Sequence, residues 1–472
     1  MIEFKNINFG LAAGEAEASR FPDLVRKGFF DDQGIINELI HGYKYLVLGH
    51  KGSGKSLIGE KLLFNSKEDN QFFCEKIMLA DFPFVNFTKI LPGKSEENNN
   101  YPKSWSLVIL ISILNQLVQN GTIGEILNNF TLISSLKEMG LLASSDFRNI
   151  VTKASQNKFK VGISALSFES NSEKNYQTNF EYLLNKLKHI LTQTNPQNKH
   201  ILVIDGLDDF LMLKEVQYQS LGGLVYEIGN LNNFFFSNGL NYKIILLCRI
   251  DLFERFPIPN KNKQRQDAAL EINWYHDTRN PQDSNLIKLA NIRANLSDSM
   301  CEDVFKTFFP SEIRGKTAIQ FLLENTRHTP RDFIQMLRSI QKFSNVMFLT
   351  EDNILSGLGE YSVNYFLPEI KDEITGYINL DKFEIFLQCL GSFRDREISI
   401  HKLIEKCKPN LEYQDVINIL KALFECSAIG NKFHGLSAEN MYCFRYRNRN
   451  CTYNPDETIV IHQGLLKALG II

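Results

Sequence analysis

A glycine-rich stretch near residue 50 contains the residue types that hold phosphate groups. It follows an apolar run, fits the pattern G-x-x-x-x-G-K-[ST], and precedes a segment with helical spacing. The glycines let successive backbone N–H groups point into one concavity, which together with the positive end of the following helix forms an anion cradle. Lys55 would reach the β- and γ-phosphates of a nucleotide, and the Ser56 hydroxyl would bind Mg²⁺. The predicted nucleotide-binding residues are Gly49, Lys51, Gly52, Ser53, Gly54, Lys55, Ser56 and Leu57.

A second group of candidate residues is acidic. Residues 201–204 are apolar and end at Asp205, a pattern typical of a buried parallel strand that delivers a carboxylate to its C-terminal edge. Asp205 would hold Mg²⁺ through water, opposite Ser56. Asp208 or Asp209, one turn further on, would orient or deprotonate the attacking water. Such a strand downstream of the glycine-rich stretch predicts hydrolysis of ATP with Mg²⁺ as the cofactor.

Two arginines are further candidates for contact with the nucleotide. Arg249 follows the apolar residues 243–248 and would either contact the γ-phosphate or form a salt bridge with Asp251 or Asp208. Arg331 begins a predicted helix, where a positive charge opposes the helix dipole. It is therefore either a lid arginine that reaches the nucleotide or an ordinary surface residue.

Buried strands must position these groups. We expect a parallel sheet with an α/β fold, in which residues 95–175 form an insertion without visible chemistry. Residues 104–142 and 180–191 have helical patterns, whereas residues 159–169 alternate like a strand. Upstream, Asp32 could cap a short helix, and Phe29 or Phe30 could stack on a nucleotide base or belong to the core. The predicted strands are residues 45–49, 76–80, 201–205, 243–248 and 270–274.

The C-terminal half is helical up to about residue 372 and then changes pattern. Three helices followed by a β-hairpin are expected after residue 380, which is the order of a winged helix. Its candidate recognition helix, residues 412–421, is net acidic, which is unfavourable beside DNA phosphates. Arg445, Arg447 and Arg449 could still contact a DNA backbone, or this surface could dock on a partner protein.

Composition limits the class of protein. The chain has 472 residues, of which 43% are hydrophobic and 22% are charged, as in ordinary globular proteins. A net charge of -2 gives no global attraction to nucleic acid. The eight cysteines form no C-x-x-C pairs, which favours reduced thiols over a disulfide framework or a zinc site. Without a signal-peptide pattern or an apolar run long enough to span a bilayer, we expect a cytoplasmic protein with no membrane contact.

These motifs resemble those of an AAA+ ATPase of the STAND type, similar to bacterial P-loop ATPases related to archaeal origin-recognition initiators. The sequence D-G-L-D-D at 205–209 resembles the acidic Walker B motif of NACHT-type STAND proteins. Arg249 takes the position of the sensor-1 residue, and T-P-R at 329–331 resembles sensor 2 in the helical lid. The resemblance extends from about residue 21 to the C-terminus. It implies an AAA+-like core with a helical lid and a C-terminal winged-helix domain.

The resemblance also implies a function. Such families are nucleotide-driven switches, in which ATP closes the lid and organises oligomers and hydrolysis releases them. It implies a homo-oligomer and a separate effector protein, because no effector domain is apparent, and a role in bacterial anti-phage defence. An arginine finger would be Arg255 or Arg265. The alternatives are an initiator-like DNA-binding ATPase that uses its winged helix, and a nucleotide-binding scaffold without turnover.

The expected domains follow from these patterns. Residues 1–20 are a loose N-terminal lead-in, and residues 21–278 are the ATPase core with its insertion. Residues 279–370 are the helical lid, and residues 371–472 are the winged-helix domain.

Overall fold

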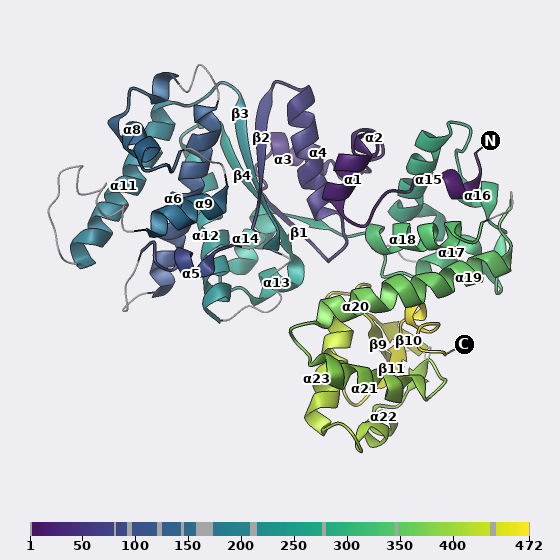
Figure 1. The fold of residues 1–472 in the computed structure, drawn as a ribbon. Coiled ribbons are helices and arrows are strands. Elements are labelled where there is room, and N and C mark those ends of the chain that lie inside the picture. The colour runs from purple at the N-terminus through teal and green to yellow at the C-terminus, as the bar shows by residue number, and fades with distance from the viewer. Residues whose placement is uncertain are drawn as a thin grey trace. The chain divides into compact units, whose positions relative to one another are not determined.

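The computed structural model describes residues 2–79, 82–91, 97–119, 125–142, 146–156, 173–207, 215–275, 280–344, 348–434 and 440–471. The chain forms two compact units (Figure 1). We call residues 31–50 and 55–272 the sheet unit, and residues 1–30, 51–54 and 273–472 the helical unit. Each unit has its own hydrophobic core. The tip of the glycine-rich loop, residues 51–54, therefore groups with the helical unit.

The sheet unit contains five strands, each parallel to its neighbours. They are β1 (Leu46–Gly49), β2 (Phe72–Met78), β3 (Lys199–Asp205), β4 (Tyr242–Arg249) and β5 (Ala269–Ile272). Their order in the sheet is β2-β3-β4-β1-β5. The helices of this unit are α3 (Ile35–His41), α4 (Lys55–Glu68), α5 (Phe84–Phe87), α6 (Glu97–Val118), α8 (Thr131–Glu138), α9 (Phe147–Ser155), α11 (Glu173–Gln193), α12 (Glu215–Ser237), α13 (Ile250–Arg255) and α14 (Lys261–Ala268).

Helices cover both faces of this sheet, which explains why β1 and β4 are buried along their whole length and why residues 244–248 of β4 are all apolar. Successive strand residues point to opposite faces. On β4, Leu246 belongs to the large apolar core that also contains residues of α6 and α12. The next residue, Leu247, approaches Gly59 of α4. Accordingly, α3 and α4 lie on one side of the sheet in Figure 1, and α6, α9 and α12 lie on the other.

The region that we predicted to be an insertion forms part of this core. Trp105 of α6 is completely buried, and its indole Nε1 donates a hydrogen bond of 2.8 Å to the carbonyl oxygen of Ser220 in α12. The helical pattern predicted for residues 104–142 is confirmed by α6 and α8 where the structure describes it. The strand predicted at residues 159–169 lies outside the described residues.

The helical unit begins with an N-terminal segment that packs against its helices. Phe4, Ile7 and Phe9 are buried in the core of this unit. Arg293, which is 1% exposed, lies with its Nη2 atom 2.6 Å from Oε1 of the buried Glu17. The prediction of a loose lead-in is therefore wrong, because a segment of mainly small and polar residues is fixed by a few large apolar residues and one buried ion pair.

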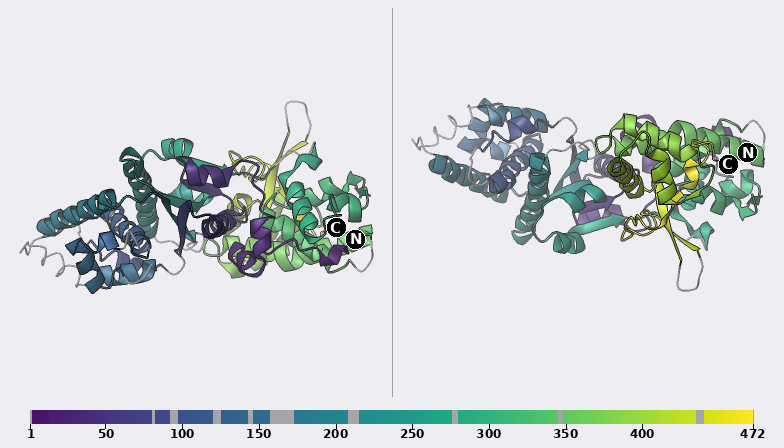
Figure 2. Two further views of the ribbon diagram at one scale, coloured as in Figure 1. Left: turned by 90° about the horizontal axis from the view of Figure 1, so that it is seen from above. Right: turned by 90° about the horizontal axis from the view of Figure 1, so that it is seen from below.

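The described elements of the helical unit come from the N-terminal segment, the lid region and the C-terminal part. They are η1 (Phe4–Asn6), α1 (Gly14–Arg20), α2 (Pro22–Arg26), η3 (Pro281–Asp283), α15 (Asn285–Ser297), α16 (Val304–Phe308), β6 (Glu312–Ile313), β7 (Lys316–Thr317), α17 (Ala318–Glu324), α18 (Pro330–Gln341), α19 (Glu351–Tyr361), a π-helical turn η4 (Ser362–Phe366), α20 (Leu367–Ile374), α21 (Leu380–Gly391), β8 (Glu397–Ile398), α22 (Ile400–Cys407), α23 (Tyr413–Glu425), β9 (Ile429–His434), β10 (Asn440–Cys443), β11 (Thr458–Ile461) and η5 (Gln463–Leu465). In both views of Figure 2, the yellow-green C-terminal elements lie together with the green helices of the lid region.

The C-terminal part has the predicted order of three helices followed by a hairpin. Its antiparallel sheet has the order β10-β9-β11-β8. A continuous helical segment, α19-η4-α20, connects the lid region to this part, and the boundary expected after residue 370 falls inside α20. Both sides of that boundary belong to one unit and share one apolar core.

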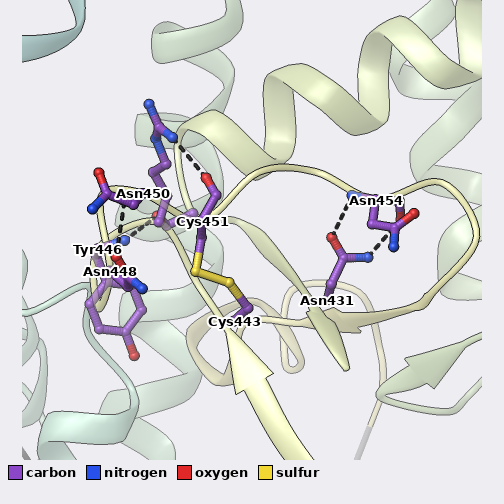
Figure 3. The surroundings of a disulfide bond; sticks show 9 residues. Asn431, Cys443, Tyr446, Asn448, Asn450, Cys451 and Asn454 are labelled. Carbon is purple, nitrogen blue, oxygen red and sulfur yellow. Dashed lines mark hydrogen bonds between the residues drawn. A yellow bond between two sulfur atoms is a disulfide. The ribbon is translucent and has the colours of Figure 1, made fainter. Parts of the chain in front are cut away.

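A disulfide closes the loop that follows β10. Cys443 and Cys451 form this bond, with their Cα atoms 6.3 Å apart (Figure 3). Beside it, Asn431 and Asn454 exchange two hydrogen bonds, each of 3.0 Å. The prediction of reduced thiols is wrong for this pair, because residues eight positions apart in sequence meet across a tight loop, whereas the other six cysteines are free thiols.

Candidate functional site

The glycine-rich loop connects β1 to α4, as the sequence predicts. Gly52 and Gly54 have φ angles of 78° and 93°, a left-handed conformation that glycine adopts without strain. Lys55 is 4% exposed, and its ammonium group donates to two carbonyl oxygens of the loop, at 3.3 Å from Gly49 and 3.1 Å from His50. The side chain therefore folds back over the loop, where an anion bound by the loop would meet it. Ser56 and Leu57 follow in the first turn of α4.

Asp205 ends β3 at the same sheet edge as the loop, because parallel strands share their carboxyl ends. Its Oδ1 accepts a 2.8 Å hydrogen bond from the backbone N–H of Gly206. Its Oδ2 lies 3.1 Å from Nζ of Lys76 on β2, and the same Nζ lies 2.8 Å from Oε1 of Glu60 on α4. The Lys76 and Asp205 side chains are each 4% exposed. This buried group links the helix after the loop to the acidic strand end.

We did not predict Lys76 and Glu60 as part of the site. The available signal was a lysine inside a predicted buried strand, where an isolated charge requires a partner. A sequence cannot name that partner, because Glu60 and Asp205 lie far from Lys76 along the chain.

The residues fit the Mg²⁺ ion that the motifs imply. Oδ2 of Asp205 is buried and pairs with the Lys76 ammonium at 3.1 Å, so a water bound to the ion would share this oxygen with Lys76. Among the described residues, no group of three or more His, Cys, Asp or Glu side chains could hold a metal without help. A Mg²⁺ ion that arrives with nucleotide phosphates needs no such group, since phosphate and water oxygens supply most of its ligands.

Arg249 forms the salt bridge that was one of its two predicted roles. Its Nε and Nη2 donate to the two oxygens of Asp251 at 3.0 and 2.8 Å. Burial alone would raise the pKa of the Asp251 carboxyl, but Arg249 lowers it below its ordinary value. Arg249 lies directly opposite Gly49 in the sheet register, so the pair stands at the strand end beside the loop.

The tip of the loop contacts other residues of the helical unit. The indole Nε1 of Trp274 donates to the carbonyl oxygen of Ser53 at 2.9 Å, and the Trp274 ring lies 6.0 Å from that of Phe30. The backbone N–H of Arg331 donates to the carbonyl oxygen of Gly52 at 3.3 Å. A Cβ atom at Gly52 would lie 3.1 Å from Cβ of Arg331 and 3.2 Å from Oγ1 of Thr329, so a side chain here would crowd this approach as well as strain the backbone.

Arg331 lies in the first turn of α18, the helix start that the sequence predicts. Thr329 is the N-cap, and its Oγ1 accepts from the backbone N–H of Asp332 at 3.2 Å, while Pro330 occupies the first turn. The Arg331 guanidinium donates from Nε to the carbonyl oxygen of Ala12 at 2.9 Å, and its Nη1 lies 3.3 Å from Oε1 of Glu369. Arg331 is therefore held by several partners rather than exposed as an ordinary surface residue.

The remaining predicted site residues have different outcomes. Asp208 and Asp209 lie outside the described residues. Arg265 pairs with Glu254 at 2.7 Å and with Glu271 at 2.5 Å. Arg255 ends α13 and is exposed.

Two arginines of the loop after β10 form hydrogen bonds and other contacts within the fold. Arg445 donates to the carbonyl oxygen of Cys451 at 2.8 Å and lies 3.3 Å from Glu425. Arg447 donates to the Tyr446 hydroxyl at 2.9 Å and lies over the rings of Phe444 and Tyr446. These contacts weaken the expectation that both side chains contact a DNA backbone.

The fold and the loop together define an AAA+-like P-loop core followed by a helical lid region, which confirms the predicted fold class. A buried acidic strand end lies at the same carboxyl edge of the parallel sheet as the glycine-rich loop, with β4 between β3 and β1. Membrane insertion has no candidate in the described part of the chain, where every helix is too short or too polar to cross a bilayer.

Comparisons with known proteins find only distant similarity. Residues 284–367 match the FunZ-associated C-terminal helical domain. No curated protein matches the chain. The structure of the Aeropyrum pernix ORC1 protein in complex with DNA is similar with a TM-score of 0.41 at 11% identity, covering 95% of this chain and 94% of that one.

Two further solved structures are similar over most of their length. Cdc6p from Pyrobaculum aerophilum has a TM-score of 0.34 at 11% identity and covers 98% of this chain and 95% of its own. The Thermotoga maritima RuvB Holliday junction branch migration motor has a TM-score of 0.29 at 10% identity and covers 91% and 88%. At these scores and identities, the matches assign no function to this chain.

Proposed function

We propose that this protein is a Mg²⁺-dependent ATP-binding and ATP-hydrolysing switch of the STAND/AAA+ type. One observation carries the proposal: Lys55 folds over a left-handed glycine loop at the same sheet edge where Asp205 ends its strand. A loop of this type binds phosphate, and a carboxylate beside it serves the metal that accompanies a nucleotide.

Each residue has a distinct role in this proposal. The backbone N–H groups of residues 51–55 bind the phosphate oxygens, and Lys55 leaves the loop carbonyls to pair with the β- and γ-phosphates. Ser56 and Asp205 would hold Mg²⁺, which when bound offsets the charge of the phosphates. Asp208 or Asp209 orients the attacking water and accepts its proton, and Arg249 senses the γ-phosphate while Asp251 holds its guanidinium.

Assembly into homo-oligomers is the second part of the proposal. Hydrolysis would then be completed by an arginine from a neighbouring copy, for which Arg255 and Arg265 are the two candidates; Arg265 pairs with Glu254 and Glu271 within its own chain. Control of a separate effector protein, and a role in anti-phage defence, rest on the resemblance to STAND ATPases.

The alternative, an initiator-like DNA-binding ATPase, has less support. The expected recognition helix corresponds to α23, whose exposed residues include Gln414, Asn418, Lys421 and Glu425 and give no net positive charge. A direct test is DNA binding as a function of salt. Affinity that falls steeply with salt, and falls further in Arg449→Ala, would support this alternative, whereas absent or salt-insensitive binding would contradict it.

Nucleotide binding tests the central proposal. In calorimetric titrations with ATP and Mg²⁺, Lys55→Ala should abolish binding, and Asp205→Asn should bind ATP but lose most of the dependence on Mg²⁺. Lys67→Ala is the matched control, since Lys67 lies on the same helix at its exposed end. Equal binding by Lys55→Ala and the wild-type protein would refute the site.

Solution mass tests assembly. The mass should rise with ATP and Mg²⁺ relative to ADP or no nucleotide, and the assembled form should persist in Asp208→Asn or Asp209→Asn if hydrolysis releases it. A mass that does not depend on nucleotide would refute control of assembly.

A further inference from the structure

The carboxylate of Glu369 forms ion pairs with two cationic side chains near the tip of the glycine-rich loop. Oε1 of Glu369 lies 3.0 Å from Nζ of Lys51, and the same oxygen lies 3.3 Å from Nη1 of Arg331. Glu369 stands in the first turn of α20, where a negative charge is favoured by the helix dipole. All three residues belong to the helical unit.

The contact is partly buried, which strengthens the electrostatic attraction between Glu369 and its two partners. The side chain of Glu369 is 13% exposed, that of Lys51 is 19% exposed and that of Arg331 is 28% exposed. Solvent screens such a pair less than a fully exposed one, and a hydrogen bond to a charged group is stronger than one between neutral groups. Two positive charges against one negative charge leave an excess of one positive charge at this point of the loop.

A carboxylate held by a lysine and an arginine presents the same chemistry as a phosphate held by these residues, since both anions offer oxygen acceptors to N–H donors. Lys51 lies within the phosphate-binding pattern, and the backbone of Arg331 is already hydrogen-bonded to Gly52 of the loop. A nucleotide bound by the loop would therefore bring phosphate oxygens close to the cations that Glu369 holds.

We propose that Glu369 is an internal competitor for the phosphates of ATP. In the protein without nucleotide it positions Lys51 and Arg331, and the arriving phosphates take its place and release α20. This inference rests on the proposed binding of ATP and adds a means of regulation to it. Because α20 continues from the lid region into the C-terminal part, loss of this contact is how the bound state would be transmitted along the helical unit.

Calorimetric titrations of the full chain with ATP, in the presence of Mg²⁺, test the competition. Glu369→Gln removes the charge at nearly constant shape and should bind ATP about tenfold more tightly, the change expected when one charged hydrogen bond no longer has to be broken. Glu369→Asp keeps the charge and should lie closer to the wild-type protein. Glu360→Gln is the control, because Glu360 pairs with Lys342 elsewhere in the unit. Titration with AMP, which lacks the competing phosphates, should show no tightening in any variant.

Hydrogen exchange in residues 367–374 gives a second readout. In the wild-type protein, exchange in α20 should rise when ATP binds, and in Glu369→Gln it should be high before ATP is added. Unchanged or weaker ATP binding by Glu369→Gln, with wild-type binding intact, would overturn the competition. Tightening of ATP and AMP to the same extent would overturn it as well. Absence of ATP binding by the wild-type protein would instead overturn the proposed function, so the two failures are distinguishable.

Discussion

His200 makes the stability of the sheet unit depend on pH. It lies near the start of β3 with 2% of its surface exposed, stacked on Phe73 at 4.9 Å and 6.3 Å from Tyr242. Neither ring nitrogen has a hydrogen-bond partner among the described residues. Burial lowers the pKa of His200 from 6.5 to about 4, because a charged imidazolium cannot be solvated there. Replacement by phenylalanine should remove this dependence.

The sign and size follow from proton binding. Between pH 6.5 and 4 the unfolded chain binds a proton at His200 and the folded chain does not, so stability is complete above pH 6.5 and is lost as the pH falls. A shift of this size corresponds to about 2.5 kcal/mol of unfolding free energy between pH 7.5 and 4.5. The free energy of unfolding of His200→Phe should therefore fall by about 2.5 kcal/mol less than that of the wild-type protein over this pH range.

Urea unfolding, followed by fluorescence of the buried Trp105, measures this difference. Carboxylates titrate in the same range, so the informative quantity is the wild-type curve minus the His200→Phe curve at each pH. His189→Gln serves as the control, since His189 is exposed on α11. A difference that stays constant from pH 7.5 to 4.5 would refute the argument that His200 remains neutral in the folded protein.

Three further outcomes follow from the structure. Asp208→Asn or Asp209→Asn should keep ATP binding but lower turnover about a hundredfold, because general-base catalysis contributes at least that much; phosphate release checks it. Arg327→Met should lower the free energy of unfolding by about 3–5 kcal/mol, since it leaves two buried carboxylates without their cation, whereas the exposed Lys342→Met should cost less than about 1 kcal/mol. Arg293→Met should destabilise the helical unit similarly and expose its N-terminal segment to proteases; unchanged proteolysis would count against it.

Local patterns were sufficient to predict the sheet, the turn between β1 and α4, and the acidic end of β3. The apolar runs before Gly49, at the end of β3 and at the end of β4 are long enough to identify buried parallel strands without knowledge of their neighbours. The cap at Thr329 and the first-turn Pro330 were predictable for the same reason, since a cap depends on residues a few positions apart.

The predictions were less accurate where two neighbouring acidic residues could each bind the N-terminus of the same helix, and where residues far apart in sequence are in contact. The N-cap of α3 is Gly34, and Asp31 rather than the expected Asp32 accepts from the first backbone N–H groups of the helix, those of Ile35 and Ile36, at 2.7 and 3.0 Å. Neighbouring aspartates have the same intrinsic preference, and only the path of the chain decides between them.

Contacts between distant residues left no local signal. Lys51 meets Glu369 through three-dimensional packing, which a pattern of residue types does not encode. The buried N-terminal segment escaped prediction because its polar composition masks three large apolar anchors. The sequence thus predicted which residues could bind a nucleotide, but not which other residues of the fold contact them.

The hydrogen bond between Trp274 and Ser53 supplies a built-in optical probe. The chain contains only two tryptophans, and the other, Trp105, is enclosed in the core of the sheet unit. In a Trp105→Phe background, all indole emission would come from a ring whose N–H is bonded to the loop itself. The arrival and departure of a ligand at that loop could then be timed in a stopped-flow instrument, without attaching a dye.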